Sequence, residues 1–244
     1  MDGVSELERA LAAAAARVAA ATVAAGRPVG SVQLLLATKA IGAQPIRQAI
    51  EAGFGLIGEN RVQELVAKAP DLADLPHRTH LIGHLQSNKV GVTLPLIDCL
   101  QSLDTVELAH KIQRRLESAD RTLDVLLQAN VSGEPGKSGV PLEELPALLA
   151  GVAACDRLIV RGYMTIGLNS PDLDAVRAGY RALADFRDRA RAQGLPGAQE
   201  AVELSMGMSG DAEAAIAEGA TIVRMGSAVF GARKPQGPPA RPVP

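Results

Sequence analysis

The stretch Val32-Gln33-Leu34-Leu35-Leu36-Ala37-Thr38-Lys39 points most directly to the fold. Its central apolar residues follow one another without polar alternation, which is typical of a strand buried on both faces in a parallel sheet. The run ends at Lys39, whose ammonium group is costly to desolvate unless it is paired, neutralised or covalently bonded. Lys39 is therefore a candidate for Schiff-base chemistry. For the other lysines we expect ordinary solvation: Lys68, Lys89, Lys111, Lys137 and Lys234.

Strand-like and helix-like segments alternate along the rest of the chain. Ser5 and Glu8 form a capping-box signature, which predicts a helix that ends near Gly26, before the first strand. The apolar runs predict strands at residues 33–37, 55–57, 80–82, 96–101, 123–130, 158–164, 202–204 and 221–225. Between them, helices are predicted from about Gln44, through Val62 and Leu65, at 85–90, after Asp104, from Pro141, after Ser170-Pro171, and at 211–218.

About eight such strand–helix units predict an α/β protein of the (β/α)8 TIM-barrel class, with one extra helix at the N-terminus. A doubly wound open sheet is the alternative, but that fold usually carries a glycine-rich fingerprint after its first strand, and this sequence has none there. We expect residues 1–232 to form a single domain. Residues 233–244 are rich in proline, which predicts a disordered tail.

Composition limits the classes of function. With 47% hydrophobic and only 2% aromatic residues among 244, the chain has enough Ala, Leu, Val and Ile for one sizeable core. No apolar run is long enough to span a membrane, so we expect a cytoplasmic protein with no membrane partner. The net charge of -2, without a basic cluster, argues against nucleic acid as a partner. Cys99 and Cys155 lack CxxC spacing, which favours buried thiols over a disulfide or a metal site.

The last two predicted strands are each followed by a turn of small residues. Ser205-Met206-Gly207-Met208-Ser209-Gly210-Asp211 follows the seventh strand, and Arg224-Met225-Gly226-Ser227-Ala228 includes the end of the eighth. In such barrels these two loops often hold phosphate, because free backbone N–H groups and hydroxyls converge there. We therefore expect an anion site that includes Ser209, Gly226 and Ser227. The alternative is that the two serines only cap helices.

Arg224 ends the eighth strand and is expected to point into the barrel mouth. It could form an ion pair with an acidic group on a neighbouring strand, such as Glu203, or it could donate a hydrogen bond to a heterocycle. Residues 133–138 look like a Walker A loop, but Val131 occupies the position of its first glycine, which favours a surface loop. His80 and His84 lack the nearby carboxylate of a zinc site, so no metal is expected.

Four motifs together resemble the YggS/PROSC family of pyridoxal phosphate homeostasis proteins. They are Gly58-Glu59-Asn60-Arg61-Val62-Gln63-Glu64, His80-Leu81-Ile82-Gly83-His84-Leu85-Gln86-Ser87-Asn88-Lys89, Leu204-Ser205-Met206-Gly207-Met208-Ser209-Gly210-Asp211 and Arg224-Met225-Gly226-Ser227-Ala228-Val229-Phe230-Gly231. The resemblance extends from about Val32 to Arg233. It implies the barrel that also forms the N-terminal domain of alanine racemase. Departures from the family pattern occur at Thr79 and at Ala37-Thr38.

The resemblance also implies a cofactor, pyridoxal 5′-phosphate (PLP), and its site. Lys39 would form a Schiff base with PLP, and Arg224 would face the pyridine nitrogen. Ser209, Gly226 and Ser227 match the family's phosphate site. The remaining residues implied to line the cofactor pocket are Asn60, His84 and Met164.

These observations favour a non-catalytic protein of intracellular PLP homeostasis, which carries or buffers the cofactor and affects amino-acid and keto-acid pools indirectly. An arginine opposite the ring nitrogen discourages its protonation and weakens the ring as an electron sink. Racemases of this fold also use a second base from another domain, for which the residues after the eighth strand leave no room.

Three alternatives stay open at this stage. The chain could be a PLP-dependent amino-acid racemase, another Schiff-base lysine barrel enzyme such as an aldolase, or a structural protein with an incidental cofactor site. For an aldolase, the only acid noted at a strand end near the mouth is Glu59. Expected partners are PLP and apo forms of PLP-dependent enzymes. The chain itself is expected to be a monomer or a weak dimer.

Overall fold

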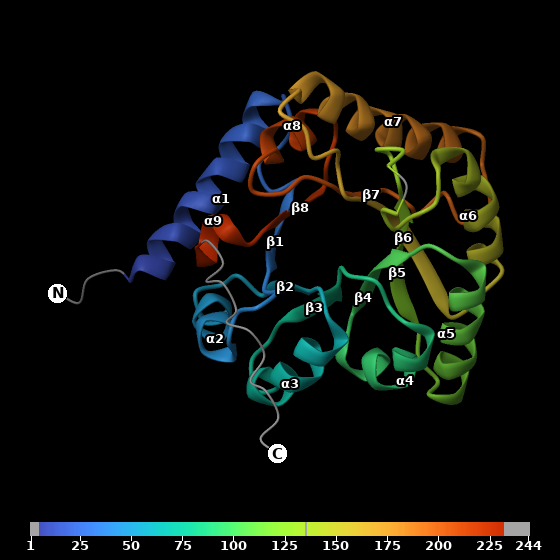
Figure 1. Ribbon diagram of the computed structural model, residues 1–244, viewed down its shortest axis with the longest axis horizontal. Coiled ribbons are helices and arrows are strands. Elements are labelled where there is room, and N and C mark those ends of the chain that lie inside the picture. The colour runs from blue at the N-terminus through green and yellow to red at the C-terminus, as the bar shows by residue number, and fades with distance from the viewer. Residues whose placement is uncertain (1–4, 135, 232–244) are drawn as a thin grey trace, which may run out of the picture.

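Eight parallel strands form a closed barrel in which each strand pairs with the next in chain order and β8 closes against β1 (Figure 1). The predicted barrel class is thus confirmed. The computed structural model describes residues 5–134 and 136–231, so the prediction for the tail, 233–244, lies outside the described residues. The strands are β1 (Gln33–Ala37), β2 (Leu56–Glu59), β3 (Arg78–Leu81), β4 (Cys99–Leu103), β5 (Leu123–Ala129), β6 (Leu158–Thr165), β7 (Glu203–Ser205) and β8 (Ile222–Met225).

Helices surround the barrel on its outer side (Figure 1). Within residues 5–134 and 136–231, none of them is both long and apolar enough to cross a membrane. The α-helices are α1 (Glu6–Ala24), α2 (Ala43–Glu51), α3 (Val62–Leu72), α4 (Val90–Thr93), α5 (Val106–Ser118), α6 (Leu145–Ala153), α7 (Leu173–Ala192), α8 (Ala212–Ala217) and α9 (Ser227–Phe230). Short 3-10 turns are η1 (Ser87–Lys89), η2 (Leu94–Leu96) and η3 (Leu142–Glu144).

Several predicted boundaries were wrong: the helix expected at 85–90 is a 3-10 turn from Ser87 followed by α4, which begins only at Val90. Two other helices begin later than expected because loop side chains cap them at other residues. The helix expected after Ser170-Pro171 begins at Leu173, and its cap is Asp172, whose carboxylate accepts from the backbone N–H groups of residues 174 and 175. Ser170 instead accepts from the Asp172 N–H in the preceding turn. Likewise, α5 is capped by Thr105 rather than by Asp104.

The extra N-terminal helix, α1, packs beside α8 and α9, the helices that follow β7 and β8 (Figure 1). Its predicted capping box is confirmed, since Ser5 N–H donates to Glu8 at 2.7 Å and Glu8 N–H donates to Ser5 Oγ at 3.1 Å. From the middle of the helix, Arg17 donates to the backbone carbonyl of Ser209 at 2.7 Å. Helix α1 therefore contacts one of the predicted phosphate loops directly.

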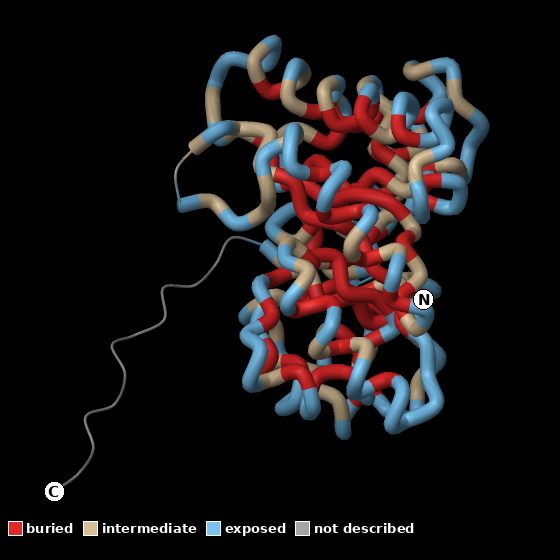
Figure 2. The backbone as a smooth tube through the Cα atoms, turned by 90° about the vertical axis from the view of Figure 1, so that its right-hand side faces the viewer, coloured by how far each residue is buried: buried red, intermediate tan, exposed pale blue. Residues whose placement is uncertain are grey.

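The apolar residues form two layers on either side of the strands. The larger layer lies between strands and helices and includes Leu36 and Leu81, while a smaller, separate cluster consists of Cys99, Leu126 and Met164. Figure 2 shows the buried residues concentrated along the strands, with the exposed ones on the outer turns. Both cysteines are buried free thiols, as expected, and burial raises the pKa of each. With few aromatic residues in the sequence, the core consists mainly of Leu, Val, Ile and Ala.

The close approach of β6 to β7 gives a first testable prediction. A Cβ atom added to Gly162 would lie 1.9 Å from the Glu203 carbonyl oxygen and 2.6 Å from its carbonyl carbon, and neither backbone atom can move aside easily. We expect Gly162→Ala to lower the free energy of unfolding by about 2 kcal/mol or more, as overpacking does. Urea denaturation measures this. Gly210→Ala is the control, because nothing lies within 4 Å of its added Cβ. Equal losses in both variants would contradict the argument.

Candidate functional site

Lys39 lies in a turn two residues beyond the end of β1. The turn is closed by a hydrogen bond from Ile41 N–H to the Thr38 carbonyl at 3.0 Å. Lys39 is half-buried rather than fully buried, because it follows the strand instead of ending inside it. The next residue, Ala40, has a φ of 63°, a left-handed conformation that is uncommon outside glycine. The backbone around Lys39 must therefore be held by its surroundings.

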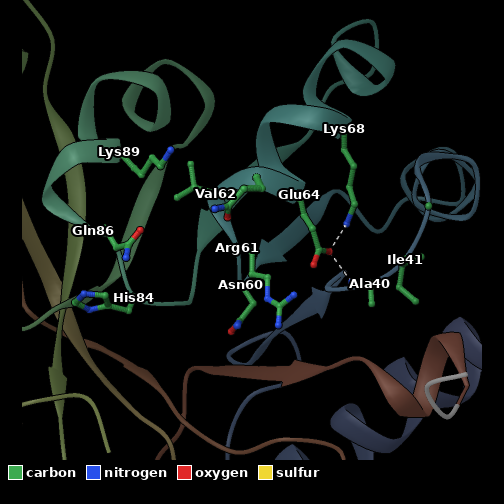
Figure 3. Close-up of a pocket in the computed structure, with 12 residues that line it drawn as sticks. Ala40, Ile41, Asn60, Arg61, Val62, Glu64, Lys68, His84, Gln86 and Lys89 are labelled. Carbon is green, nitrogen blue, oxygen red and sulfur yellow. Dashed lines mark hydrogen bonds and ion pairs between the residues drawn. The ribbon is translucent and has the colours of Figure 1, made fainter. Parts of the chain in front are cut away.

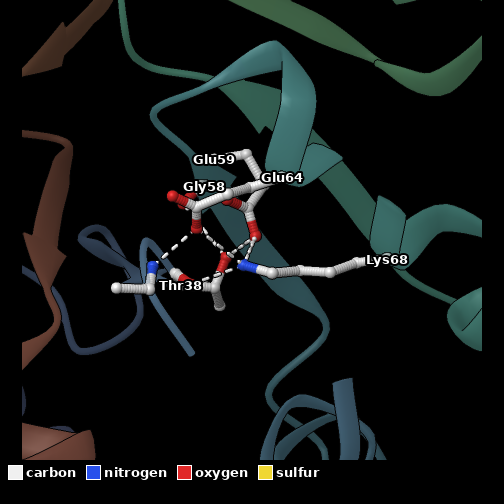
Figure 4. Close-up of polar contacts among 6 residues, drawn as sticks. Thr38, Gly58, Glu59, Glu64 and Lys68 are labelled. Atoms are coloured by element: carbon white, nitrogen blue, oxygen red, sulfur yellow. Dashed lines mark hydrogen bonds and ion pairs between the residues drawn. The ribbon is translucent and has the colours of Figure 1, made fainter. Parts of the chain in front are cut away.

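A second lysine, Lys68 on α3, holds this turn (Figure 4). Its Nζ donates to the Thr38 carbonyl at 2.9 Å and to Glu59 Oε1 at 2.8 Å. The Thr38 hydroxyl donates to the same carboxylate oxygen of Glu59 at 2.6 Å. On the other side of Lys39, Ala40 N–H donates to Glu64 Oε2 at 2.6 Å, and Lys68 donates to that oxygen at 3.1 Å. We call Thr38, Glu59, Glu64 and Lys68 the turn clamp.

The clamp corrects two expectations from the sequence. Lys68 is not an ordinary solvated lysine, since its side chain is only 12% exposed. Glu59, considered as an acid at the barrel mouth, instead faces α3, and its side chain is 2% exposed. Its second oxygen, Oε2, is buried without a hydrogen-bond partner within the described part of the chain. The sequence signal for the role of Lys68 was its i,i+4 spacing from Glu64. This spacing is equally common on solvated helix surfaces.

The two predicted phosphate loops meet beside the end of β1. Ala228 N–H, at the start of α9, lies 3.4 Å from Ser209 Oγ in the loop after β7. A Cβ on Gly226 would lie 2.8 Å from the Ala37 carbonyl oxygen, so glycine lets β8 and its loop approach the last residue of β1. Neither serine is an N-cap, since Asp211 precedes α8 and Gly226 precedes α9. Ser209 nevertheless accepts from an N–H in the first turn of α9, and Ser227 is the first residue of that helix, so a helix-start role and an anion site are both compatible with this geometry.

Residues that the sequence did not single out support the Ser209 loop. Asp211 accepts from Met208 N–H at 2.6 Å with one carboxylate oxygen and from the Tyr180 hydroxyl at 2.7 Å with the other. Burial and this bond raise the pKa of Tyr180. Arg17, which donates to the Ser209 carbonyl, is itself held by an ion pair with Glu213. The only sequence signal for Arg17 was its position as a single charge within an alanine-rich stretch.

Arg224 is 5% exposed and lies inside the barrel. One terminal nitrogen donates to the carbonyl and the hydroxyl of Ser205 at 2.7 and 2.8 Å, and the other donates to the Thr165 carbonyl at 2.8 Å. These hydrogen bonds hold Arg224, and not the ion pair with Glu203 that the sequence left open. Burial lowers the pKa of Arg224 to about 10, so the guanidinium remains charged at neutral pH. Met164, on β6, is fully buried in the inner cluster.

A cavity of about 770 Å³ opens beside the turn that carries Lys39. Asn60 and His84 both contribute to it, so the structure brings these two predicted residues together (Figure 3). His84 and Gln86 lie on one side of the cavity, and Ala40 and Ile41 lie on the other. The full lining is Ala40, Ile41, Gly42, Asn60, Arg61, Val62, Gln63, Glu64, Lys68, His84, Gln86 and Lys89.

The structure places the Walker-like segment and the two histidines in surroundings other than those that their motifs suggest. Lys137 of the Walker-like segment forms an ion pair with Glu134 at 2.7 Å, and no helix follows this segment directly. His80 is buried and contacts Gln101, whereas His84 is exposed. Among residues 5–134 and 136–231 there is no group of three or more His, Cys, Asp or Glu side chains that could hold a metal ion.

Comparison with known proteins shows the family of this chain. Residues 4–234 match the family described as alanine racemase, N-terminal domain. The pyridoxal phosphate homeostasis protein of Pseudomonas aeruginosa is 41% identical over 231 residues, which cover 94% of this chain and 97% of that protein. The chain belongs to the pyridoxal phosphate homeostasis protein family. The member from Escherichia coli K12 is 38% identical over 224 residues, covering 89% of this chain and 92% of that protein. The resemblance drawn from the four motifs is thus confirmed.

Solved structures agree with this membership. PipY of Synechococcus elongatus PCC7942, with PLP bound, has a TM-score of 0.77 and 33% identity, covering 88% of this chain and all (100%) of that one. Alanine racemase from Clostridium difficile 630 has a TM-score of 0.68 at 12% identity, and the match covers 91% of this chain but 57% of the racemase. At that identity the likeness to the racemase shows the fold alone.

The turn clamp gives a second prediction. Lys68→Met would leave the buried carboxylate of Glu59 without its cation, and breaking a buried ion pair on one side typically costs about 3–5 kcal/mol. We expect a loss in this range in urea denaturation of the apo protein. The double variant Lys68→Met, Glu59→Gln should recover part of it, because the unpaired charge is gone. Arg157→Met, at an ion pair with the exposed Asp120, is the control and should cost less than about 1 kcal/mol. A loss at Lys68 no larger than the control would contradict the clamp.

Proposed function

We propose that this chain binds PLP covalently through Lys39 and serves intracellular PLP homeostasis in the cytoplasm, as a carrier or buffer of the cofactor. The observation that carries the proposal is one juxtaposition at the barrel mouth. The clamped turn with Lys39, the loops of Ser209 and Gly226, and the buried Arg224 all lie at the carboxyl ends of β1, β7 and β8. The name of the relatives and the PLP-bound structure of PipY support it.

The residues present fit a phosphate group. The contact of Ser209 Oγ with Ala228 N–H, at 3.4 Å, is long for a hydrogen bond, so both groups are available to bind an anion instead. Glycine at position 226 keeps the backbone free of a Cβ that would collide with the Ala37 carbonyl. Ser227 is exposed at the start of α9, and we assign its hydroxyl to the same phosphate. Asn60, His84 and Met164 remain proposed pocket residues.

PLP, when bound, supplies an aldehyde that can bond to an amine and a conjugated ring that can accept electrons. The protein's contribution is to hold and orient it. The clamp fixes the backbone on both sides of Lys39, so that its amine is presented from one turn conformation. Arg224 retains its charge and offers N–H donors, and a cationic donor beside a pyridine nitrogen opposes its protonation. An unprotonated ring is a weaker electron sink, which suits retention rather than turnover.

Three of the acid–base groups near the mouth, Glu59, Asp211 and Tyr180, also favour a carrier. Glu59 is ion-paired with Lys68 on the α3 side of β2, and the Tyr180 hydroxyl donates to Asp211. Each of these groups is therefore engaged in holding the backbone of a loop, either the Lys39 turn or the Ser209 loop. A racemase or another Schiff-base lysine enzyme remains the competing function. We propose apo forms of PLP-dependent enzymes as recipients of the cofactor.

The covalent assignment predicts the result of one substitution. Purified protein given PLP should show a visible absorption band that borohydride removes, with a gain of mass at Lys39. Lys39→Ala should lose this band, whereas Lys111→Ala, a substitution on the outer helix α5, should keep it. Equal bands in Lys39→Ala and the wild type would contradict the assignment.

Two measurements, of amino-acid racemisation and of PLP transfer to an apo enzyme, distinguish a carrier from an enzyme. The loaded protein should racemise amino acids at no more than the rate of free PLP, and it should reactivate an apo PLP-dependent enzyme. Substantial racemisation that depends on Lys39 would favour the enzyme. If reactivation never exceeds what PLP released into solution explains, buffering stands and direct delivery does not.

A further inference from the structure

A chain of polar side chains crosses the interior of the barrel and ends on Arg224. Ser205 Oγ accepts from Arg224 at 2.8 Å and donates its own proton to Gln101 Oε1 at 2.6 Å. The amide nitrogen of Gln101 lies 2.7 Å from Nδ1 of His80. At the far end, Nε2 of His80 lies 3.2 Å from the guanidinium of Arg78, an exposed residue at the start of β3.

This series of polar side chains crosses the interior of the barrel and does not follow its wall. Gln101 is on β4, which pairs with β3 and β5, whereas Ser205 is on β7, which pairs with β6 and β8. Their hydrogen bond therefore joins strands that are not neighbours in the sheet. Such a bond can form only through the space that the strands enclose.

Because these polar side chains are buried, leaving any of their hydrogen bonds unformed would cost free energy. Gln101 and Ser205 are fully buried, and His80 is 1% exposed. An amide or a hydroxyl in such an environment is unfavourable unless it is hydrogen-bonded, and removing one partner leaves the other unsatisfied. His80 is neutral in this setting, because burial, helped by the charge of Arg78, lowers its pKa to about 3. A neutral imidazole has a single lone pair, which Nδ1 offers to the Gln101 amide; the ring proton is then on Nε2, so Arg78 lies near that nitrogen without hydrogen-bonding to it.

Gln101 suits the middle of the chain because a carboxamide is an acceptor at one end and a donor at the other. Its oxygen takes the hydroxyl proton of Ser205, which leaves an oxygen lone pair of that hydroxyl for Arg224. Without this acceptor the hydroxyl would be free to rotate, and one of the three contacts that orient the guanidinium would no longer have a fixed geometry. Hydrogen bonds in such a series also strengthen one another.

We propose that Gln101, acting through Ser205 and anchored by His80, is a positioning residue that orients Arg224 toward the ring nitrogen of bound PLP. This inference rests on the proposed function. It assigns a role to side chains from β3 and β4, on the opposite part of the barrel wall from the strand that carries Arg224. Gln101 and His80 lie outside the proposed phosphate loops and the turn of Lys39, and Ser205 is the last residue of β7, directly before the Ser209 loop.

The test compares two ligands that differ only at the ring nitrogen. One is PLP, and the other is its carbocyclic analogue, in which a C–H group replaces that nitrogen. Gln101→Leu should weaken PLP binding about tenfold, as expected for one net hydrogen bond, and should leave binding of the analogue within about twofold of wild type. The absorption maximum of bound PLP should shift in the same variant, and Ser205→Ala, which keeps the backbone carbonyl that Arg224 also uses, should act in the same direction.

Cys99→Ala is the matched control. It also shortens a buried side chain of β4, but Cys99 packs against Leu126 and Met164 and is not part of the series of polar side chains. We expect it to change the affinities for both ligands equally or not at all. If Gln101→Leu fails to fold, Ser205→Ala decides the question, because it removes a single oxygen atom.

The outcomes distinguish this inference from the proposed function. If both variants keep the wild-type ratio of the two affinities and the wild-type absorption maximum, the positioning role is wrong, while PLP binding by the wild type still stands. If the wild type shows no band with PLP that depends on Lys39, the proposed function itself fails, and the inference fails with it.

Discussion

The pairing of β8 with β1 is the interaction on which the rest of the structure depends. It closes the sheet, with Leu35 opposite Arg224 and Leu36 opposite Met225. Closure brings the end of the first strand next to the loop that follows the last, although most of the chain separates them. An open sheet would leave the Lys39 turn and the Gly226 loop at opposite edges. The candidate site exists because the barrel closes.

Closure alone would not fix the Lys39 turn, and the turn clamp shows what does. Lys68 reaches from α3 to the carbonyl before Lys39, and Glu64 from the same helix accepts from the N–H after it. The helix that covers β2 thus sets the conformation of the turn after β1. Glu59 is buried, Lys68 and Glu64 are half-buried, and all three are paired, so their contribution is to specify one conformation at some desolvation cost.

On the other side of the mouth, the Ser209 loop is likewise fixed by side chains that reach it from other positions. Arg17, from the helix added before the barrel, donates to the Ser209 carbonyl, and Asp211 fixes the N–H of Met208. Elements outside the conventional barrel therefore hold the loop that we assign to phosphate. Inside the barrel, His80, Gln101 and Ser205 form a series of polar contacts that ends on Arg224, where apolar packing would be usual.

The fold class could be predicted because its signal is local: continuous apolar runs such as 33–37 mark strands buried on both faces, and their alternation with helices indicates a parallel barrel. Lys39, Ser209 and Gly226 could be placed at the barrel mouth because they lie in short motifs at strand ends. The boundary at Asp172 could not, since Ser170, Pro171 and Asp172 all have helix-start chemistry and only the hydrogen bonds formed decide among them.

The sequence by itself determined the order of strands and helices, the aliphatic core and the identity of the residues at the barrel mouth, because these follow from nearest neighbours along the chain. Only the tertiary structure decided which distant residues meet. Lys68 has the sequence context of a solvated lysine, and Gln101 that of an ordinary strand residue. Their roles arise from packing α3 against β2 and from facing β4 and β7 across a closed interior, and no local pattern encodes those distances.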